Sequence, residues 1–284
     1  MFTDDPVTPL HVETVIEVLR RLGSRKLTRE ALYGALQPNG IAGSQQQSKD
    51  SIRASIELEL VNEKEGSELE LTEAAKGRRS VRDCILEAID KQVLCNVEIE
   101  YYFALFYSYM LGLDKGTGKR KRDEWVTAFN RDVFDNKKLT NQFNADKWSG
   151  LHRWFVYTGL GWYDPDGEFQ CSPYHRVHRK LPEIFSGTHK LDDKSFMGRI
   201  ATVCPELDGG AIFEQANRKR PAGIRKCTLG LSHTLINLHL DNVIKLHCSR
   251  DSSGWSLQEA SPPNDGKTLL SDRIDFVELR KGAR

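Results

Sequence analysis

The 284-residue sequence lacks a charge excess, a long apolar run and closely paired cysteines. Lys and Arg number 41 and Asp and Glu 40, so the formal net charge of +1 excludes a uniformly basic coat for nucleic acid but allows local basic patches. Because no segment reaches about 18 uninterrupted apolar residues, we predict no transmembrane helix and no membrane partner. No basic segment precedes an apolar stretch near Met1, so we expect no signal peptide and a cytoplasmic location.

Cysteine and histidine are too dispersed to indicate a metal site. The six cysteines form no Cys-x-x-Cys pair, which favours free thiols in a reducing compartment. Cys171, His175 and His178 have a ligand-like spacing but no second cysteine pair. We interpret them as a cysteine on a strand and two solvent-facing histidines, and we predict no bound metal.

Recognisable catalytic motifs are also missing. Gly116-Thr117-Gly118-Lys119 resembles part of a phosphate-binding loop, but that loop needs glycine where Leu113 stands and Ser or Thr where Arg120 stands. The sequence contains no Gly-x-Ser-x-Gly elbow, no His-Glu-x-x-His pair and no dinucleotide fingerprint. We predict a protein that is not an enzyme and that binds no cofactor.

The sequence does contain a succession of short amphipathic helices followed by a hairpin. Near the N-terminus, apolar residues from Val12 to Leu22 recur at helical spacing and Gly23 ends that helix. Thr28 and Ser48 are placed to cap a second and a third helix. The alternating residues 68–71 then predict the return strand of a β-hairpin.

The same order of elements recurs twice. In the second stretch we predict helices at 123–134, at 139–143 and after Asn144, followed by strands on either side of the turn at residues 164–167. In the third, helices near 196–203, 211–217 and 231–238 precede strands at 243–248 and 255–257. Leu60, Leu160 and Leu240 stand at the three joints between third helix and hairpin, and their irregular spacing indicates structural repetition without tandem sequence repeats.

Three helices followed by a hairpin resemble the winged helix-turn-helix superfamily. We predict a mainly α (α+β) fold of tandem winged-helix modules, each with three helices and a β-hairpin. The modules span residues 1–72, 115–181 and 182–284, the last including a C-terminal strand, and residues 73–114 form connecting helices. The resemblance implies docking to nucleic acid or protein but does not specify either.

The connecting segment is rich in aromatic residues between Val97 and Leu113. Apolar residues fall on all faces of the expected helix, which favours burial on several sides in a core between the first two modules. The alternative is a surface for a partner or a homodimer, because Tyr and Phe are enriched at interfaces.

A narrower resemblance rests on the opening module. Its Leu-Tyr-Gly-Ala-Leu-x-Pro segment (Leu32 to Pro38) and its helix from Ser48 to Leu60 resemble the DpdG-like winged-helix accessory proteins of bacterial DNA-modification and phage-defence clusters. This resemblance implies a subunit of a DNA-processing assembly.

The hairpin of the opening module is acidic. Residues 57–70 carry six glutamates against Lys64 alone, and such a surface repels a DNA duplex. We interpret it either as a solvated acidic surface or as a protein-docking wing, in which the candidate partner-binding residues are Glu63, Glu65 and Glu68.

Cations cluster in and around the second and third modules. They flank the predicted third helices, which enter the major groove in DNA-binding winged helices, while phosphate neutralisation supplies most of the affinity. The candidate DNA-binding residues are Lys119, Arg120, Lys121, Arg122, Lys147, His152, Arg153, Arg176, Arg179, Lys180, Arg218, Lys219, Arg220, Arg225 and Lys226. Thr228, Ser232, His233 and Asn237 add polar groups on the third helix of the last module.

These observations predict a non-enzymatic subunit that binds double-stranded DNA mainly through phosphates and docks protein subunits of the same assembly. One alternative is a sequence-specific transcriptional regulator or replication initiator, which needs base readout and a dimer. A second alternative is a structural scaffold without DNA binding.

Overall fold

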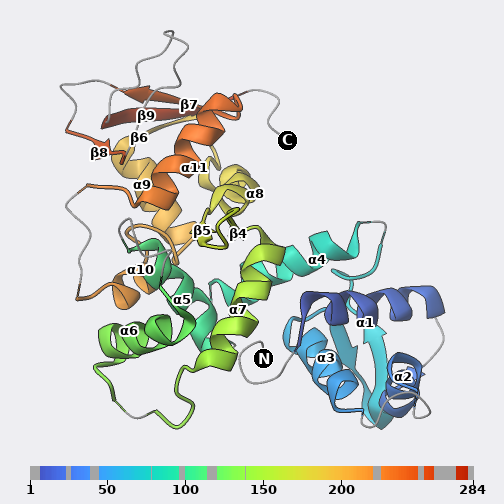
Figure 1. The fold of residues 1–284 in the computed structure, drawn as a ribbon. Helices are drawn as coiled ribbons and strands as arrows, with labels where there is room; N and C mark the ends of the chain where they lie inside the picture. Colours follow the sequence, from blue (N-terminus) through green and yellow to red (C-terminus); the bar gives the residue numbers. More distant parts are fainter. Residues whose placement is uncertain are drawn as a thin grey trace. The chain divides into compact units, whose positions relative to one another are not determined.

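A computed structural model describes residues 7–23, 27–38, 45–77, 79–95, 100–113, 120–137, 139–219, 225–248, 253–258 and 273–280. These residues are mainly helical with small antiparallel sheets, which confirms the α+β class (Figure 1). The chain divides into two compact units. Unit 1 comprises Met1–Phe103 and Asn144–Tyr157, and unit 2 comprises Ala104–Phe143 and Thr158–Arg284. No described helix is both long and apolar enough to span a bilayer.

Unit 1 opens with three helices and a three-stranded antiparallel sheet. The elements are α1 (Pro9–Leu22), β1 (Leu27–Thr28), α2 (Arg29–Leu36), α3 (Gln46–Glu57), β2 (Val61–Glu63), the 3-10 turn η1 (Glu65–Ser67) and β3 (Glu68–Leu71). β3 lies between β1 and β2. α1 packs its buried stripe, which includes Val12, Ile16 and Leu19, on α3, as the helical spacing predicted.

The rest of unit 1 joins segments that are distant in the sequence. These segments are α4 (Val81–Ala88), the π turn η2 (Ile89–Val93) and α7 (Ala145–Thr158) up to Tyr157. Trp154 is fully buried, and its indole Nε1 donates a hydrogen bond to the Val7 carbonyl at 3.0 Å. The Tyr157 hydroxyl donates to the Glu13 carboxylate at 2.6 Å. α7 is therefore tied to the N-terminal segment.

An aromatic core lies in unit 2. It is built from α5 (Tyr101–Leu111), which enters unit 2 at Ala104, and α6 (Arg122–Phe134). The Phe106 ring lies 5.0 Å from that of Phe129 and 4.7 Å from that of Phe143, centroid to centroid. Every residue from Tyr102 to Leu111 is buried, which confirms the predicted burial of this helix.

The C-terminal part of unit 2 has the same sheet topology as unit 1. Its elements are α8 (Tyr174–Ile184), β6 (Lys190–Asp192), α9 (Asp193–Val203), α10 (Ala211–Ala216), α11 (Leu229–Leu240), β7 (Ile244–Cys248), β8 (Trp255–Ser256) and β9 (Arg273–Leu279). The strand order β6-β9-β7 repeats the order β1-β3-β2. In each sheet the strand that comes last in the sequence, β9 or β3, lies in the middle. In both cases the last residue of the short first strand caps the next helix: Thr28 accepts from Ala31 N, and Asp192 accepts from Ser195 N.

A second hairpin in unit 2 matches the first residue for residue. β4 (Gly161–Tyr163) pairs with β5 (Phe169–Cys171) in the register Gly161↔Cys171, while β2 pairs with β3 in the register Val61↔Leu71. A residue with positive φ precedes both hairpins, Glu59 at 55° and Gly159 at 71°. We call β2–β3 the first hairpin and β4–β5 the second hairpin.

The expected helix at 139–143 does not form. Its described residues adopt turn and irregular conformations. The Asn130 side-chain amide donates to the Phe143 carbonyl at 2.9 Å, which holds the segment against α6. Asn144 caps α7 as predicted, since its Oδ1 accepts from Asp146 N and Lys147 N. The segment 115–181 contributes to both units, because α7 up to Tyr157 belongs to unit 1 whereas α6 and the second hairpin belong to unit 2.

Three expectations for the third stretch are corrected. The partner of β7 is β9, and the strand expected at 255–257 is the short β8 at one end of β9. The helix expected to come first, α9, follows β6 and therefore corresponds to α2. The helix that corresponds to α1 is α8, and α10 has no counterpart among α1, α2 and α3. Leu240 is 55% exposed and does not occupy the third joint. Val243 does, because its carbonyl accepts from Arg280 N as the Leu60 carbonyl accepts from Thr72 N.

Candidate docking and nucleic-acid surfaces

Two acids of the first hairpin form ion pairs. Glu63 accepts from Arg29 of α2 at 2.5 Å, and Glu70 pairs with Lys64 at 2.7 Å. The hydrogen bond from Lys64 holds the pKa of the Glu70 carboxyl below its ordinary value. Arg29 lies outside the stretch 57–70, so a count along the sequence overstates the local negative charge.

The other two predicted partner-binding acids have different settings. Glu65 is exposed in the turn η1, where Gly66 adopts a φ of 76°. Glu68 is half-buried and lines a pocket. The three acids predicted to bind a partner therefore lie on one hairpin but do not form a single exposed cluster.

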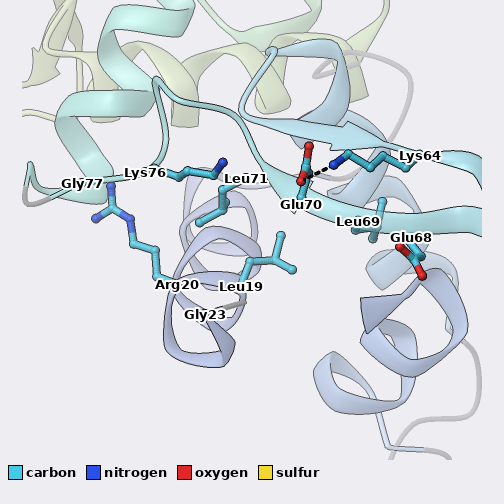
Figure 2. A pocket seen from close by; sticks show the side chains of 10 residues that line it. All are labelled: Leu19, Arg20, Gly23, Lys64, Glu68, Leu69, Glu70, Leu71, Lys76 and Gly77. Carbon is cyan, nitrogen blue, oxygen red and sulfur yellow. Dashed lines mark ion pairs between the residues drawn. The ribbon is translucent and has the colours of Figure 1, made fainter. Parts of the chain in front are cut away.

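The pocket has a volume of about 640 Å³ and lies between the end of α1 and the strand β3 (Figure 2). Leu19, Leu69 and Leu71 supply apolar walls. Lys64 on its rim is paired with Glu70, and Lys76 with Glu73 at 2.7 Å.

Arg20 on the same rim is held by the backbone. Its Nε and Nη2 donate to the Ala75 carbonyl, and its Nη1 donates to the Arg79 carbonyl at 2.8 Å. Cations that already have internal partners add little attraction for a phosphate. A pocket with three leucines in its wall and paired cations on its rim is better suited to a protein side chain.

Three of the predicted DNA-binding residues are buried, so their placement on a DNA-binding surface is wrong. Lys147 and His152 lie on the inner face of α7 with exposures of 4% and 3%. Lys147 Nζ lies 5.8 Å from the Tyr102 ring centroid, and the His152 ring stacks on Trp148 at 4.0 Å. Burial lowers the pKa of His152 to about 3, so the ring is neutral at physiological pH.

Arg176 is the third buried residue, and it belongs to the interior of unit 2. Its side chain and that of Glu206 are fully buried, with Nε donating to Oε1 at 2.8 Å. The nearby carboxylate of Asp208 accepts from Thr228 N and from Thr228 Oγ1. Burial raises the pKa of Asp208 to about 6. Paired charges at this depth have a structural role in unit 2.

Several other predicted cations have ion-pair partners. Arg218 and Lys219 both bind the Asp135 carboxylate at the end of α6. The hydrogen bond from Lys219 lowers the pKa of Asp135. Lys180 pairs with Glu183 at 2.9 Å. These pairs reduce the positive charge that residues 218–219 present to solvent.

The remaining predicted cations are distributed over both units. Lys121 and Arg122 are exposed at the start of α6, where Arg122 also lies 3.8 Å from the Asp123 carboxylate, and Arg153 is exposed on the part of α7 that belongs to unit 1. Lys226 is exposed before α11. The half-buried cations are Arg120, whose guanidinium lies 5.4 Å from the Trp125 ring centroid, Arg225, which donates to Ser253 O, and Arg179. Lys119 and Arg220 lie outside the described residues.

The helix α11 offers few groups for base readout. It contains no Lys or Arg. Thr228 caps the helix, and the buried Ser232 donates to the Thr228 carbonyl at 2.7 Å. Only His233 and Asn237 of the four predicted polar groups are exposed.

The second hairpin carries exposed aromatic residues that the charge-based sequence argument missed. Trp162 is 52% exposed and Tyr163 is 46% exposed. Two adjacent exposed aromatic side chains are a candidate interaction surface, because Trp and Tyr are enriched at protein interfaces. The signal in the sequence is the absence of Lys and Arg between residues 154 and 175, combined with three acids at the turn.

All six cysteines are free thiols. Within the part of the chain that the structure describes, no group of three or more His, Cys, Asp or Glu side chains is arranged to hold a metal ion.

A family model described as DpdG-like matches residues 3–252. No curated protein and no solved structure matches the chain. Since the family match covers more than half of the 284 residues, the chain belongs to the DpdG-like family. This membership points to an accessory role in a DNA-modification cluster.

Proposed function

We propose that this DpdG-like protein is a non-enzymatic subunit of a bacterial DNA-modification or phage-defence assembly that binds double-stranded DNA through phosphates and docks a protein partner. The observation that carries the proposal is the repeated topology. A short strand, a long final strand and three helices recur in each unit with sheet orders β1-β3-β2 and β6-β9-β7. This order is typical of winged helices, which bind DNA or protein.

The DNA-contacting residues are the exposed cations. Lys121 and Arg122 at the start of α6 and Lys226 before α11 serve unit 2, and Arg153 serves unit 1. Contacts of this kind attract phosphates and carry no sequence information. The small number of polar groups exposed on α11 supports phosphate binding over sequence-specific regulation.

The protein-docking surface of unit 1 is the first hairpin with its pocket. Glu65 and Glu68 contribute acidic groups to this surface, and Leu19 and Leu71 line the apolar part of the pocket beside them. A partner segment with an apolar side chain and a basic neighbour matches both features.

The test is fluorescence anisotropy with a labelled duplex of about 30 base pairs, from roughly 50 to 300 mM salt. We expect binding that weakens steeply with salt and that falls at least about tenfold in Lys121→Glu/Arg122→Glu. The matched control is Lys137→Glu/Lys194→Glu, which makes the same charge change at exposed residues of unit 2. Equal losses in both variants would contradict a localised phosphate site.

A scaffold without DNA binding is the second candidate. The observation that favours it is that Arg176 is buried and that Arg218 and Lys219 are paired with Asp135. No binding to the duplex at the lowest salt would select the scaffold, and a specificity ratio of about 10³ over random duplex would select a regulator.

A further inference from the structure

The second hairpin presents two aromatic side chains to solvent on a stiffened turn. Trp162 and Tyr163 occupy outward positions that are also exposed in the first hairpin, where Asn62 and Glu63 stand. The hairpin backbone therefore does not require aromatic residues there. Their presence calls for an explanation outside the packing of the hairpin itself.

The turn between the strands is held by one side chain. The Asp164 carboxylate accepts from the backbone N–H groups of Asp166 at 3.0 Å and Glu168 at 2.8 Å, and from the Gln170 side-chain amide at 2.8 Å. The hydrogen bond from Glu168 N lowers the pKa of Asp164, so the carboxyl stays ionised at neutral pH. A stiff turn limits the entropy lost when its side chains bind.

The ring of Tyr163 is also oriented by packing within the hairpin. Tyr163 packs edge-on against Phe169, with ring centroids 5.4 Å apart. Phe169 lies over Gly161, where a Cβ would be only 2.4 Å from the Phe169 ring. Trp162 faces the opposite side of the hairpin, because side chains alternate along a strand. Both faces of the hairpin thus carry an exposed ring.

The charged residues of the second hairpin itself are all acidic. Asp164, Asp166 and Glu168 lie in the turn, and no Lys or Arg occurs between residues 154 and 175. Negative charge repels both DNA phosphates and anionic lipid head groups. An exposed aromatic ring next to carboxylates attracts Lys and Arg through cation–π and Coulomb interactions together.

We propose that the second hairpin, through Trp162, Tyr163 and the carboxylates of Asp166 and Glu168, is a docking site for a basic segment of a partner protein in which Lys or Arg alternates with apolar residues. This site lies outside the surfaces assigned above and does not depend on DNA binding. Trp and Tyr are among the residues that most often dominate the energy of a protein interface.

The experiment measures anisotropy of the full chain with a fluorescein-labelled Gly-Lys-Leu-Arg-Gly-Lys-Leu-Arg peptide at 50 and 300 mM salt. We expect Trp162→Ala to weaken binding about fivefold or more at both salt concentrations, and Trp162→Phe to restore most of it. Asp166→Asn/Glu168→Gln should weaken binding at 50 mM salt and have little effect at 300 mM, because salt screens exposed charges. Asp164 is left unchanged because it holds the turn.

The matched control is Leu240→Ala, which removes another exposed apolar side chain of unit 2. We expect it to leave peptide affinity unchanged. The proposal is overturned if the wild-type protein shows no saturable binding, if a peptide with Glu in place of Lys and Arg binds equally well, or if Leu240→Ala has the same effect as Trp162→Ala. It is also overturned if Trp162→Ala abolishes binding to a 20-nucleotide single-stranded thymidine oligomer while the basic peptide does not bind.

Loss of duplex binding in Lys121→Glu/Arg122→Glu has no bearing on peptide binding to the second hairpin. The DNA-binding proposal and the peptide-docking proposal can therefore be contradicted independently. Far-ultraviolet circular dichroism of each variant verifies that the fold is retained, which the 52% exposure of Trp162 leads us to expect.

Discussion

The first and second hairpins share one backbone and differ in nearly every outward side chain. Val61 pairs with Leu71 in the first hairpin, and Gly161 pairs with Cys171 in the second. The number of residues between the paired positions is therefore the same in both hairpins. In both, the residue before the hairpin holds a carbonyl that accepts from the residue after it: Leu60 from Thr72 N and Leu160 from Ser172 N. The hairpins share this buried joint, so the backbone is the same in both. The residues at the exposed positions can differ without changing it.

The hairpins also differ at an inward position, and different kinds of ion pair lie near them. Val61 fills the space at its joint with a buried side chain, whereas Gly161 leaves that space to the ring of Phe169. Charges near the first hairpin are surface pairs such as Arg29–Glu63. The chain after the second hairpin instead enters α8, whose Arg176 is buried in an ion pair. Equivalent hairpins are therefore compatible with different surroundings.

The largest effect is expected from Arg176→Met. It leaves Glu206 buried without its cationic partner, and removing one partner of a buried pair costs about 3–5 kcal/mol in the free energy of unfolding. Urea denaturation measures the loss. The double variant Arg176→Met/Glu206→Leu should recover part of it, and a single variant as stable as wild type would show that the pair contributes nothing.

Gly161→Val tests why the two hairpins differ at the joint. The new Cβ would lie 2.4 Å from the Gln170 carbonyl oxygen and from the Phe169 ring, so we expect a loss of about 2–3 kcal/mol from overpacking. Gly198→Ala on α9 is the control, because no described atom lies within 4 Å of the position that its new Cβ would take and alanine favours helix. A tolerated valine at 161 would mean that Phe169 can move away freely.

Unit 1 is expected to lose stability in acid through His152. Its pKa is about 3 in the folded protein against about 6.5 in the unfolded chain, so stability is lost as pH falls below 6.5. Between pH 7 and pH 5 this loss is about 2 kcal/mol. His152→Gln should remove it in urea titrations at the two pH values, and an unchanged pH dependence would contradict the burial of a neutral imidazole.

Unit 2 is expected to respond in the opposite direction through Asp208. Its folded pKa of about 6 lies above the unfolded value of 3.8, so the folded state binds the proton more tightly and stability rises as pH falls through 6. The gain between pH 7 and pH 5 is about 1 kcal/mol. Asp208→Asn should abolish this gain. A variant that still gains stability in acid would place the titrating group elsewhere.

The smallest effect is expected from Arg29→Met beside the first hairpin. Its pair with Glu63 is partly exposed on both sides, with side-chain exposures of 34% and 31%. We expect a change of less than about 1 kcal/mol, which shrinks further at high salt. A loss comparable to that of Arg176→Met would remove the contrast between the two regions.

Local signals in the sequence located most elements. Thr28 and Asn144 cap α2 and α7 as their residue types predict, because a cap needs only its own next turn of helix. Ser48 was wrongly predicted as a cap: α3 begins two residues earlier, and Ser48 N and Oγ both donate to the side chain of Gln37. A competing side chain 11 residues away decided that end of the helix.

The candidate sites were harder to predict. The cationic character of the segments around Arg122 and Arg218 is plain in the sequence, but the partner of Arg218 is Asp135, 83 residues away. The helical spacing of α7 does not by itself show which face is inward. The hydrogen bond from Trp154 to the Val7 carbonyl identifies that face. Charge counted along the chain therefore overestimated the positive charge that the predicted DNA-binding segments expose to solvent.

The helix periods, the turns, the α+β class and the acidic or aromatic character of each hairpin follow from the order of residues, because they depend on neighbours a few positions away. Contacts in three dimensions were needed to establish that β9 and not β8 pairs along β7, that Arg176 and Lys147 are buried, and that Trp162 stays exposed. Strand pairing and desolvation depend on groups brought together from distant parts of the chain. No local pattern encodes how much water each side chain keeps.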